Sequence, residues 1–300
     1  MIKQEYLNQV SLLVDVLPYI KQEKCFALKG GTAINMFYQN LPRLSVDIDL
    51  TYIDFCERED AYKNIDNALE RINKNLNSVG YKSFIRGNTE KKIICSNNKT
   101  SIKIEPNYTV RGCIFQPQEL SVCNKAEDLF GYVDCNVLSK PETYGGKISA
   151  ALNRQHPRDL FDIYQLFEQN AMTDDILEGF IVMLLSAPRP IYELLNPNIL
   201  DQQRVFDTEF IGMTDLEFTY KQHTDTLKQL IDYVQYKVKS NYKDFLLNFV
   251  SLDLDLQKVD IPNIEKLPAI KWKIQNLEKL KNINPEKFAK EYQELKNILD

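Results

Sequence analysis

Hydrophobic positions along the chain change between the spacing of helices and the spacing of strands. Near the N-terminus four apolar residues recur three or four positions apart: Val10, Leu13, Val14 and Leu17. This spacing makes one apolar helix face, so a helix is predicted over residues 5–20. Short apolar runs predict strands over residues 25–28 and 46–52, with a helix over residues 32–38 between them. Apolar residues at helical spacing also predict a helix over residues 57–79, which ends at Gly80, a common helix stop.

The middle of the chain has the shorter period of strands. Residues 81–138 contain short alternating apolar runs, which predict strands and hairpins. Helices are predicted over residues 141–154 and 157–169, because a proline stands at the start of each. We therefore expect an α/β or α+β N-terminal half with a mixed β-sheet flanked by helices.

The pattern after the predicted sheet is helical. Residues 176–185 and 215–242 have helical periodicity. The stretch 187–197 contains three prolines and is predicted to be a hinge or an inter-domain connection. We predict a mixed domain over residues 1–170 and an all-α C-terminal domain over residues 171–300.

The composition is that of a globular chain. Three hundred residues suffice for two ordinary domains, and the chain is 44% hydrophobic and 26% charged. The longest nearly unbroken apolar run, residues 179–187, is half of what a membrane crossing needs. Charges near the N-terminus are scattered through an amphipathic pattern, unlike those of a signal peptide. We expect a cytoplasmic protein with no membrane partner.

Cysteine and histidine usage excludes several classes of enzyme. The six cysteines show no CxxC spacing, and His156 and His223 are the only two histidines. Cysteines in apolar, strand-like contexts are expected to fill the core of a protein in a reducing compartment. So few histidines leave little material for a zinc site or a Ser-His-Asp triad. Most hydrolase and metalloprotease functions are thereby excluded.

The net charge of −5 argues against a protein that coats nucleic acid, because phosphate neutralisation needs clustered Lys and Arg. Two groups of lysines are candidates for holding an RNA end locally, although solvated faces explain each lysine more simply. They are Lys91, Lys92, Lys99 and Lys103 in one group, and Lys266, Lys271, Lys273, Lys279 and Lys281 in the other.

The segment Lys29-Gly30-Gly31-Thr32 precedes the predicted helix over residues 32–38. Its glycine turn would present backbone N–H groups and the positive end of the helix dipole to an anion. Thr32 fits as the N-cap in the absence of ligand, with a hydroxyl able to turn to a phosphate. Alone this turn is weak evidence, because many helices begin after glycine.

Two aspartates, Asp47 and Asp49, follow on the next predicted strand. Residues i and i+2 of a strand share a face, so the two carboxylates would project together. Mg²⁺ commonly joins such carboxylates to substrate phosphates. Two aspartates alone are explained more simply as a surface pair at a strand end. With the glycine turn upstream, they indicate a site for a metal-bound nucleoside triphosphate and therefore a nucleotidyl transferase.

A third carboxylate would complete a two-metal site. The best candidate is Glu105, which stands on an alternating run and faces the way Lys103 faces. A charge on the solvent side of an edge strand explains Glu105 equally well.

The segment from residue 141 to residue 166 is rich in charge. Lys147 and Arg154 lie two helical turns apart and so share one face. Lys147 could neutralise charge on a transferred phosphate, and Asp159 could orient Lys147 or accept a proton. Stabilisation of a helix's first turn explains Asp159 and Asp162 equally well.

Several separated blocks carry the resemblance to a known family. They are Leu28-Lys-Gly-Gly-Thr-Ala-Ile-Asn35 with Arg43-Leu-Ser-Val-Asp-Ile-Asp49, Ile102-Lys-Ile-Glu105, Gly146-Lys-Ile-Ser-Ala-Ala151, Arg158-Asp-Leu-Phe-Asp-Ile-Tyr164, Phe210-Ile-Gly-Met-Thr214 and Leu267-Pro-Ala-Ile-Lys-Trp-Lys273. As a combination they resemble the AbiEii-type nucleotidyl transferases, the toxin half of type IV toxin–antitoxin systems. The resemblance covers nearly the whole chain.

The resemblance implies a core of the DNA polymerase β-like minimal nucleotidyltransferase superfamily, followed by a helical domain. The catalytic residues that it implies are Asp47, Asp49, Glu105, Lys147 and Asp159, the first three as ligands of Mg²⁺ or Mn²⁺. The nucleotide-binding residues that it implies are Gly30, Gly31, Thr32 and Ser45. One departure is that the superfamily usually has Gly-Ser and a somewhat shorter gap, whereas fourteen residues here separate Thr32 from Asp47.

The resemblance also implies a reaction. Related toxins add nucleotides to the 3′ end of tRNA, while others were first described as GTP binders. We expect attack of an RNA 3′ hydroxyl on the α-phosphate of a nucleoside triphosphate. Two alternatives stay open, which are a protein hydroxyl as the acceptor and a nucleotide-binding regulatory protein without transfer. In the type IV scheme a cognate antitoxin acts without forming a stable complex.

Overall fold

The computed structural model describes residues 2–256 and 259–300, and the chain divides into two compact units. The first unit runs to Thr143 and also contains Phe210–Glu217, while the second comprises Tyr144–Glu209 and Phe218–Asp300. The sequence instead predicts a boundary after residue 170. The compact units do not show which residues take part in one function. The nucleotidyltransferase domain predicted over residues 1–170 therefore stays a prediction.

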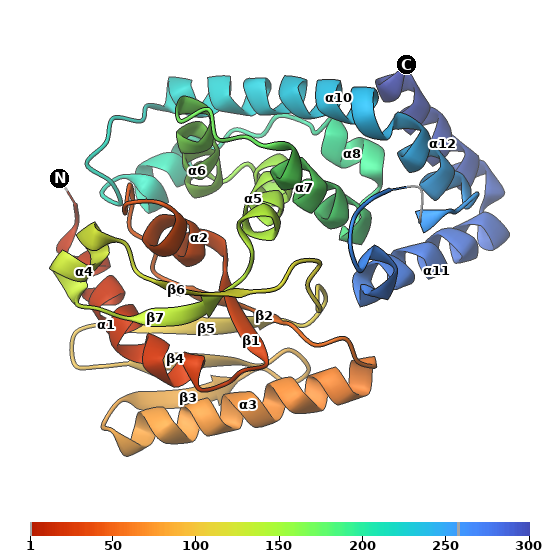
Figure 1. Cartoon of the computed structure of the whole chain (residues 1–300). Coiled ribbons are helices and arrows are strands. Elements are labelled where there is room, and N and C mark those ends of the chain that lie inside the picture. Colours follow the sequence, from red (N-terminus) through yellow and green to blue (C-terminus); the bar gives the residue numbers. More distant parts are fainter. Residues whose placement is uncertain (1, 257–258) are drawn as a thin grey trace. The chain divides into compact units, whose positions relative to one another are not determined.

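A seven-stranded mixed sheet forms the framework of the first unit (Figure 1). Its strands are β1 (Phe26–Lys29), β2 (Ile48–Tyr52), β3 (Lys82–Arg86), β4 (Lys92–Ser96), β5 (Ser101–Asn107), β6 (Gln118–Ser121) and β7 (Asp134–Val137). They lie in the order β3-β4-β5-β2-β1-β7-β6. β2 runs parallel to β5 and antiparallel to β1, so the predicted mixed sheet is confirmed.

Two long helices supply the apolar core on this sheet, α1 (Gln4–Lys21) and α3 (Arg58–Ser78). α1 contacts β5 and β7, and α3 contacts β3 and β4 (Figure 1). The strand residues Ile48, Leu50 and Ile104 belong to the same buried cluster as the apolar faces of the two helices. Since side chains alternate along a strand, the charged residues between these apolar positions point to the opposite sheet face.

The predicted helix over residues 32–38 begins two residues earlier. α2 (Gly30–Ala33) continues into η1 (Ile34–Tyr38), which is one turn of π-helix. The predicted strand over residues 46–52 begins later, at Ile48, so Asp47 lies just before β2. One further helix of the first unit, α4 (Asn124–Phe130), lies between β6 and β7 along the chain.

Every regular element described wholly within the second unit is a helix. After α5 (Lys140–Arg154) these elements are α6 (Pro157–Glu168), α7 (Asp174–Ser186), α8 (Ile191–Leu195), α9 (Gln203–Val205), α10 (Tyr220–Ser251), η4 (Ile264–Lys266), α11 (Pro268–Ile283) and α12 (Pro285–Leu299). The long helix α10 contacts α6 and α12 (Figure 1). None of the described helices combines the length and hydrophobicity that crossing a lipid bilayer requires.

The predicted hinge over residues 187–197 is wrong. This stretch lies within the second unit and contains α8, which starts directly after Pro190. Ile191, Leu194 and Leu195 are buried, and this burial holds the stretch in the unit. Pro188 and Pro190 therefore precede α8, Pro197 follows it, and none of the three separates domains.

A segment from the C-terminal half belongs to the first unit. Residues 210–217 pack on the chain that leads to the two aspartates. The Leu44 amide donates to the Met213 carbonyl at 2.7 Å, and the Thr214 hydroxyl donates to the Pro42 carbonyl at 2.7 Å. The described regular elements of residues 171–300 are thus helices, but this region also supplies a strut, residues 210–217, to the sheet-containing unit.

Within the second unit, the backbones of α5 and α7 approach closely at Gly145. A Cβ at this position would lie 2.2 Å from the carbonyl carbon of Gly179 and 2.4 Å from the amide nitrogen of Phe180. Real Cβ atoms do not approach backbone atoms so closely, so the helices must separate to admit a side chain. At the adjacent Gly146 a Cβ would meet no atom within 4 Å.

We predict that Gly145→Ala lowers the free energy of unfolding by about 2 kcal/mol, because the helix backbones cannot yield without losing packing. Gly146→Ala is the matched control and should be neutral or stabilising by about 0.5–1 kcal/mol, since alanine favours an open helical position. Urea denaturation of both variants measures the difference. Equal midpoints for the two variants would contradict the close contact.

Candidate active site

The glycine turn between β1 and α2 is in direct contact with the second aspartate. Gly30 has a φ of +70°, and a Cβ there would lie 2.7 Å from Oδ2 of Asp49. Glycine is required both for the left-handed backbone and for the approach of the carboxylate. At Gly31 a Cβ would lie 2.8 Å from Nη2 of Arg43 and 2.8 Å from Oγ of Ser45. The turn predicted to bind an anion therefore adjoins a carboxylate, a guanidinium and a hydroxyl.

Thr32 connects this turn to the aspartate segment. Its buried hydroxyl donates to the Asp47 carbonyl at 2.6 Å and lies 3.1 Å from Oγ of Ser45. The prediction of Thr32 as the N-cap is wrong, because α2 begins at Gly30 and its N-cap is Lys29. The hydroxyl instead fixes the backbone just before β2, across the fourteen-residue gap.

Four charged residues line one row across neighbouring strands. Lys29 of β1 is the register partner of Asp49 on β2, and Asp49 is the partner of Glu105 on β5. Ile93 of β4 pairs with Ile104, so the same antiparallel register places Lys92 opposite Glu105. We call Lys29, Asp49, Glu105 and Lys92 the charged row. Since β5 lies between β4 and β2, the interpretation of Glu105 as a charge on an edge strand is wrong.

The outer lysines of the charged row offset the two carboxylates between them. Lys92 Nζ lies 2.6 Å from Oε1 of Glu105. Burial lowers the pKa of the Lys29 ammonium below its ordinary value, and the nearby Asp49 carboxylate opposes this shift only in part. Neighbouring like charges on one sheet face are destabilising, and the flanking ammonium groups reduce that cost.

Asp47 and Asp49 suit a divalent ion. Both are half-buried, and Asp49 adjoins the glycine turn. Mg²⁺ is usually held by one or two carboxylates together with substrate phosphates and water, which matches two aspartates beside a turn that is predicted to bind an anion. Over residues 2–256 and 259–300, no three His, Cys, Asp or Glu side chains are grouped as a ready metal site. Glu105 is engaged by Lys92.

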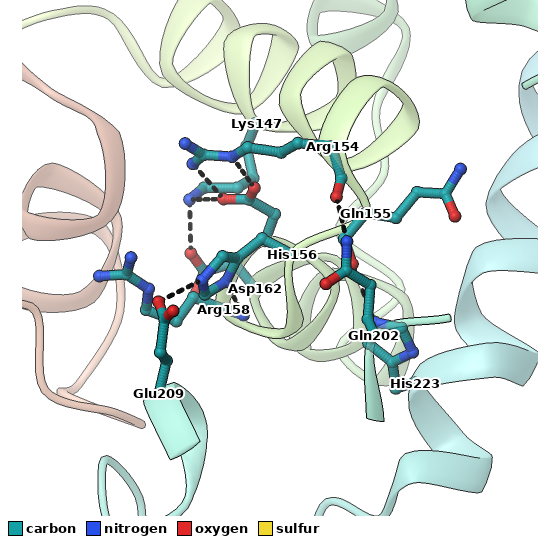
Figure 2. Close-up of polar contacts among 10 residues, drawn as sticks. Lys147, Arg154, Gln155, His156, Arg158, Asp162, Gln202, Glu209 and His223 are labelled. Carbon is teal, nitrogen blue, oxygen red and sulfur yellow. Dashed lines mark hydrogen bonds and ion pairs between the residues drawn. The ribbon is translucent and has the colours of Figure 1, made fainter. Parts of the chain in front are cut away.

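A second cluster of charged residues lies within the second unit (Figure 2). Lys147 of α5 lies 2.9 Å from Oδ1 of Asp159 and 3.0 Å from Oδ2 of Asp162, both on α6. The side chains of Lys147 and Asp159 are only 6% and 1% exposed. The structure thus brings together Lys147 and Asp159, which the sequence singles out, and adds Asp162 to them.

Arg154 completes this cluster from the end of α5 (Figure 2). Its Nε and Nη2 donate to the two carboxylate oxygens of Asp159 at 2.6 Å and 3.0 Å. The shared helix face predicted for Lys147 and Arg154 is confirmed, because both reach Asp159. Burial alone would raise the pKa of the Asp159 carboxyl, but Lys147 and Arg154 outweigh it and hold that pKa well below the usual range.

The low pKa of Asp159 separates its two predicted roles. A carboxylate that binds protons so weakly is a poor general base at neutral pH, while its hydrogen bonds to Lys147 and Arg154 suit an orienting role. The helix N-terminus is capped by His156, whose Nδ1 accepts from the Arg158 amide. Asp159 lies in the first turn of α6, but its carboxylate pairs with Lys147 and Arg154 and does not cap the helix.

The structure places four further residues against candidate site residues; the sequence suggested no role for three of them, and it suggested Lys92 only as a candidate for holding an RNA end. Arg43 lies beside Gly31, and Lys92 pairs with Glu105. Arg154 and Asp162 flank the Lys147–Asp159 pair. The helical spacing of Arg154 from Lys147, and of Asp162 from Asp159, could have indicated both residues. The pairing of Lys92 with Glu105 depends on a strand register that no short sequence pattern specifies.

The chain is similar to known toxins over most of its length. The family described as nucleotidyl transferase AbiEii toxin, type IV toxin–antitoxin system, matches residues 11–276. Among solved structures, MenT4, a nucleotidyltransferase toxin from Mycobacterium tuberculosis H37Rv, shares 13% sequence identity with a TM-score of 0.57. That likeness covers 92% of this chain and 94% of that chain, and at this identity it concerns the fold. No curated protein matches significantly.

The family match contains both the glycine turn with its aspartates and the buried lysine–aspartate cluster. It also spans the sheet of the first unit and most helices of the second unit. The expected family is therefore confirmed: the chain belongs to the AbiEii nucleotidyl transferase toxins of type IV toxin–antitoxin systems and is a nucleotidyltransferase.

Proposed function

We propose that this toxin transfers a nucleoside monophosphate from a nucleoside triphosphate to the 3′ end of tRNA. The contact between the Asp49 carboxylate and the Gly30 turn carries the proposal. It sets a metal-binding group directly beside backbone N–H groups suited to phosphate. In the reaction the RNA 3′ oxygen bonds to the α-phosphorus, the bond to the leaving pyrophosphate breaks, and the hydroxyl proton passes to solvent.

The residues around the glycine turn would bind the triphosphate. Backbone N–H groups of Gly30 and Gly31 would face phosphate oxygens, and the hydroxyls of Thr32 and Ser45 would supply further donors. The Thr32 hydroxyl would have to leave the Asp47 carbonyl, so we assign it the weaker phosphate contact. Arg43 adds a buried positive charge beside Gly31.

Asp47 and Asp49 would hold Mg²⁺, or Mn²⁺ in its place, with Glu105 as the third carboxylate of the set. A divalent ion bound there would offset triphosphate charge and favour ionisation of the attacking hydroxyl. The family supports a divalent metal in general terms, because nucleotidyltransferases generally use one.

Lys147 would offset negative charge that develops on the transferred phosphate. Two of the three N–H donors of its ammonium are directed at Asp159 and Asp162, which would fix the direction of the third. Asp159 and Arg154 would then be positioning residues for Lys147.

Lysines and one aromatic residue support an RNA acceptor. Lys91 and Lys92 are engaged by carboxylates, and Lys273 is buried and donates to the carbonyls of Ala187 and Arg189, so these three lysines fit an RNA surface poorly. The other predicted lysines are exposed: Lys99, Lys103, Lys266, Lys271, Lys279 and Lys281. Trp272, 57% exposed, offers a stacking surface on α11, the helix that also carries Lys271 and Lys279.

The proposed acceptor has consequences for the partners of the chain. A tRNA acceptor would be met in the cytoplasm, and we propose that a cognate antitoxin counteracts the toxin without a stable complex. The family description, which names a type IV toxin–antitoxin system, supports an antitoxin of this kind.

We predict that the purified chain labels total tRNA when incubated with Mg²⁺ and the correct α-labelled nucleotide. Asp49→Asn should lower labelling at least about a hundredfold, because it removes a metal-binding charge without changing the shape of the side chain. The readout is label in nuclease-sensitive bands on a denaturing gel, with each nucleotide tried in turn.

Asp128→Asn is the matched control for this experiment, since Asp128 is an exposed aspartate on α4 of the same unit. It should label tRNA like the wild type. Label confined to protease-sensitive bands would overturn the tRNA acceptor and favour transfer to a protein hydroxyl. Equal labelling by wild type and Asp49→Asn would overturn the metal role of Asp49.

We predict that Lys147→Met lowers the free energy of unfolding by about 3–5 kcal/mol, because it leaves the buried Asp159 and Asp162 carboxylates without their ammonium partner. Arg154→Met should cost less, since the Arg154 side chain is 59% exposed and Lys147 still faces Asp159. Denaturant titration of the full chain measures both. A cost for Lys147→Met no larger than that for Arg154→Met would contradict this account, and transfer is compared only under conditions where both variants are folded.

A further inference from the structure

The Lys92 ammonium is a counter-charge for Glu105, and the proposed metal site assigns it no role. Lys92 Nζ lies 2.6 Å from Oε1 of Glu105, and the strand register sets the two residues opposite each other. Asp49, the neighbour of Glu105 on the other side, instead packs against the glycine turn. The third carboxylate is therefore held on the side away from Asp49.

The ion pair between Lys92 and Glu105 is weak enough for a divalent ion to replace it. The side chains of Lys92 and Glu105 are 38% and 34% exposed, so solvent screens their attraction. A divalent ion carries twice the charge of an ammonium and binds carboxylate oxygens directly. Such an ion can displace Lys92, but it must first overcome the ion pair and the repulsion of the ammonium.

The opposite face of the same sheet contains a natural control. Lys91 precedes Lys92 in the chain, and its Nζ lies 2.7 Å from Oδ2 of Asp66 on α3. Its exposure is comparable, with both side chains of that pair 28% exposed. Removing the charge of Lys91 thus alters net charge as much as removing that of Lys92, without touching the charged row.

We propose that Lys92 is a positioning residue that occupies the cation place beside Glu105 in the free enzyme and so sets the affinity of the acidic residues for a divalent ion. This inference rests on the proposed metal-binding role of Asp47 and Asp49. In the free enzyme the first ion binds at the two aspartates, and Glu105 becomes a metal ligand only after Lys92 leaves it.

The test measures Mn²⁺ binding to the full chain without nucleotide or RNA, by the loss of the electron paramagnetic resonance signal of free Mn²⁺. Lys92→Met should tighten Mn²⁺ binding about fivefold, which corresponds to removal of an exposed ion pair. Lys92→Arg, which keeps the charge, and Lys91→Met, which removes the neighbouring charge, should both bind like the wild type.

A double variant assigns the gain to Glu105. In the wild-type background Glu105→Gln should change Mn²⁺ affinity by less than about twofold, because Lys92 already occupies that carboxylate. In the Lys92→Met background the same change should remove the fivefold gain. Unequal effects of Glu105→Gln in the two backgrounds therefore support the proposal.

Three results would overturn the inference, and they differ in what else they affect. If Asp49→Asn abolishes Mn²⁺ binding while Lys92→Met binds like the wild type, Lys92 does not set the affinity and the proposed metal site stands. If neither wild type nor Lys92→Met shows binding that depends on Asp49, the metal role in the proposed function fails together with this inference. Equal tightening by Lys91→Met and Lys92→Met would also overturn it, since net charge would then be the cause.

Discussion

Two carboxylates on neighbouring strands, Asp49 and Glu105, constrain the residues around them, because like charges side by side on a sheet face repel each other. Asp49 and Glu105 are register partners on one face of a sheet whose other face is apolar core. Neither can turn inward without burying a charge, so the repulsion has to be offset in place. Two features meet that requirement: Lys29 and Lys92 on the flanking strands β1 and β4, and the glycine turn, which makes room for the Asp49 carboxylate.

The two charge clusters of the protein have opposite characters. The charged row of the first unit includes the half-exposed pair of Lys92 and Glu105. Solvent screens this ion pair, so either side chain can exchange its partner. The cluster around Lys147 is buried, and its carboxylates hold the ammonium in one direction. An ion pair in the charged row can therefore be replaced at a lower cost than the ion pairs around Lys147.

Local patterns predicted the elements well and the contacts between them poorly. The apolar stripe of α1 and that of α3 are readable because a helix repeats every 3.6 residues whatever it packs against. Thr32 was misassigned because N-cap preference is local, whereas its true acceptor is the carbonyl of Asp47, fifteen positions away. The register that faces Lys92 with Glu105 follows from the sheet order, which a single sequence does not encode in any short motif.

The strut over residues 210–217 gives the molecule a late step in its assembly. The Leu44 amide and the Pro42 carbonyl, which precede the aspartates, bond to Met213 and Thr214. On the ribosome the sheet strands emerge before these partners, so the loop ahead of Asp47 cannot form these two bonds until residues 210–217 have also emerged. The backbone that leads to the aspartates is thereby completed only after every strand of the sheet has been synthesised.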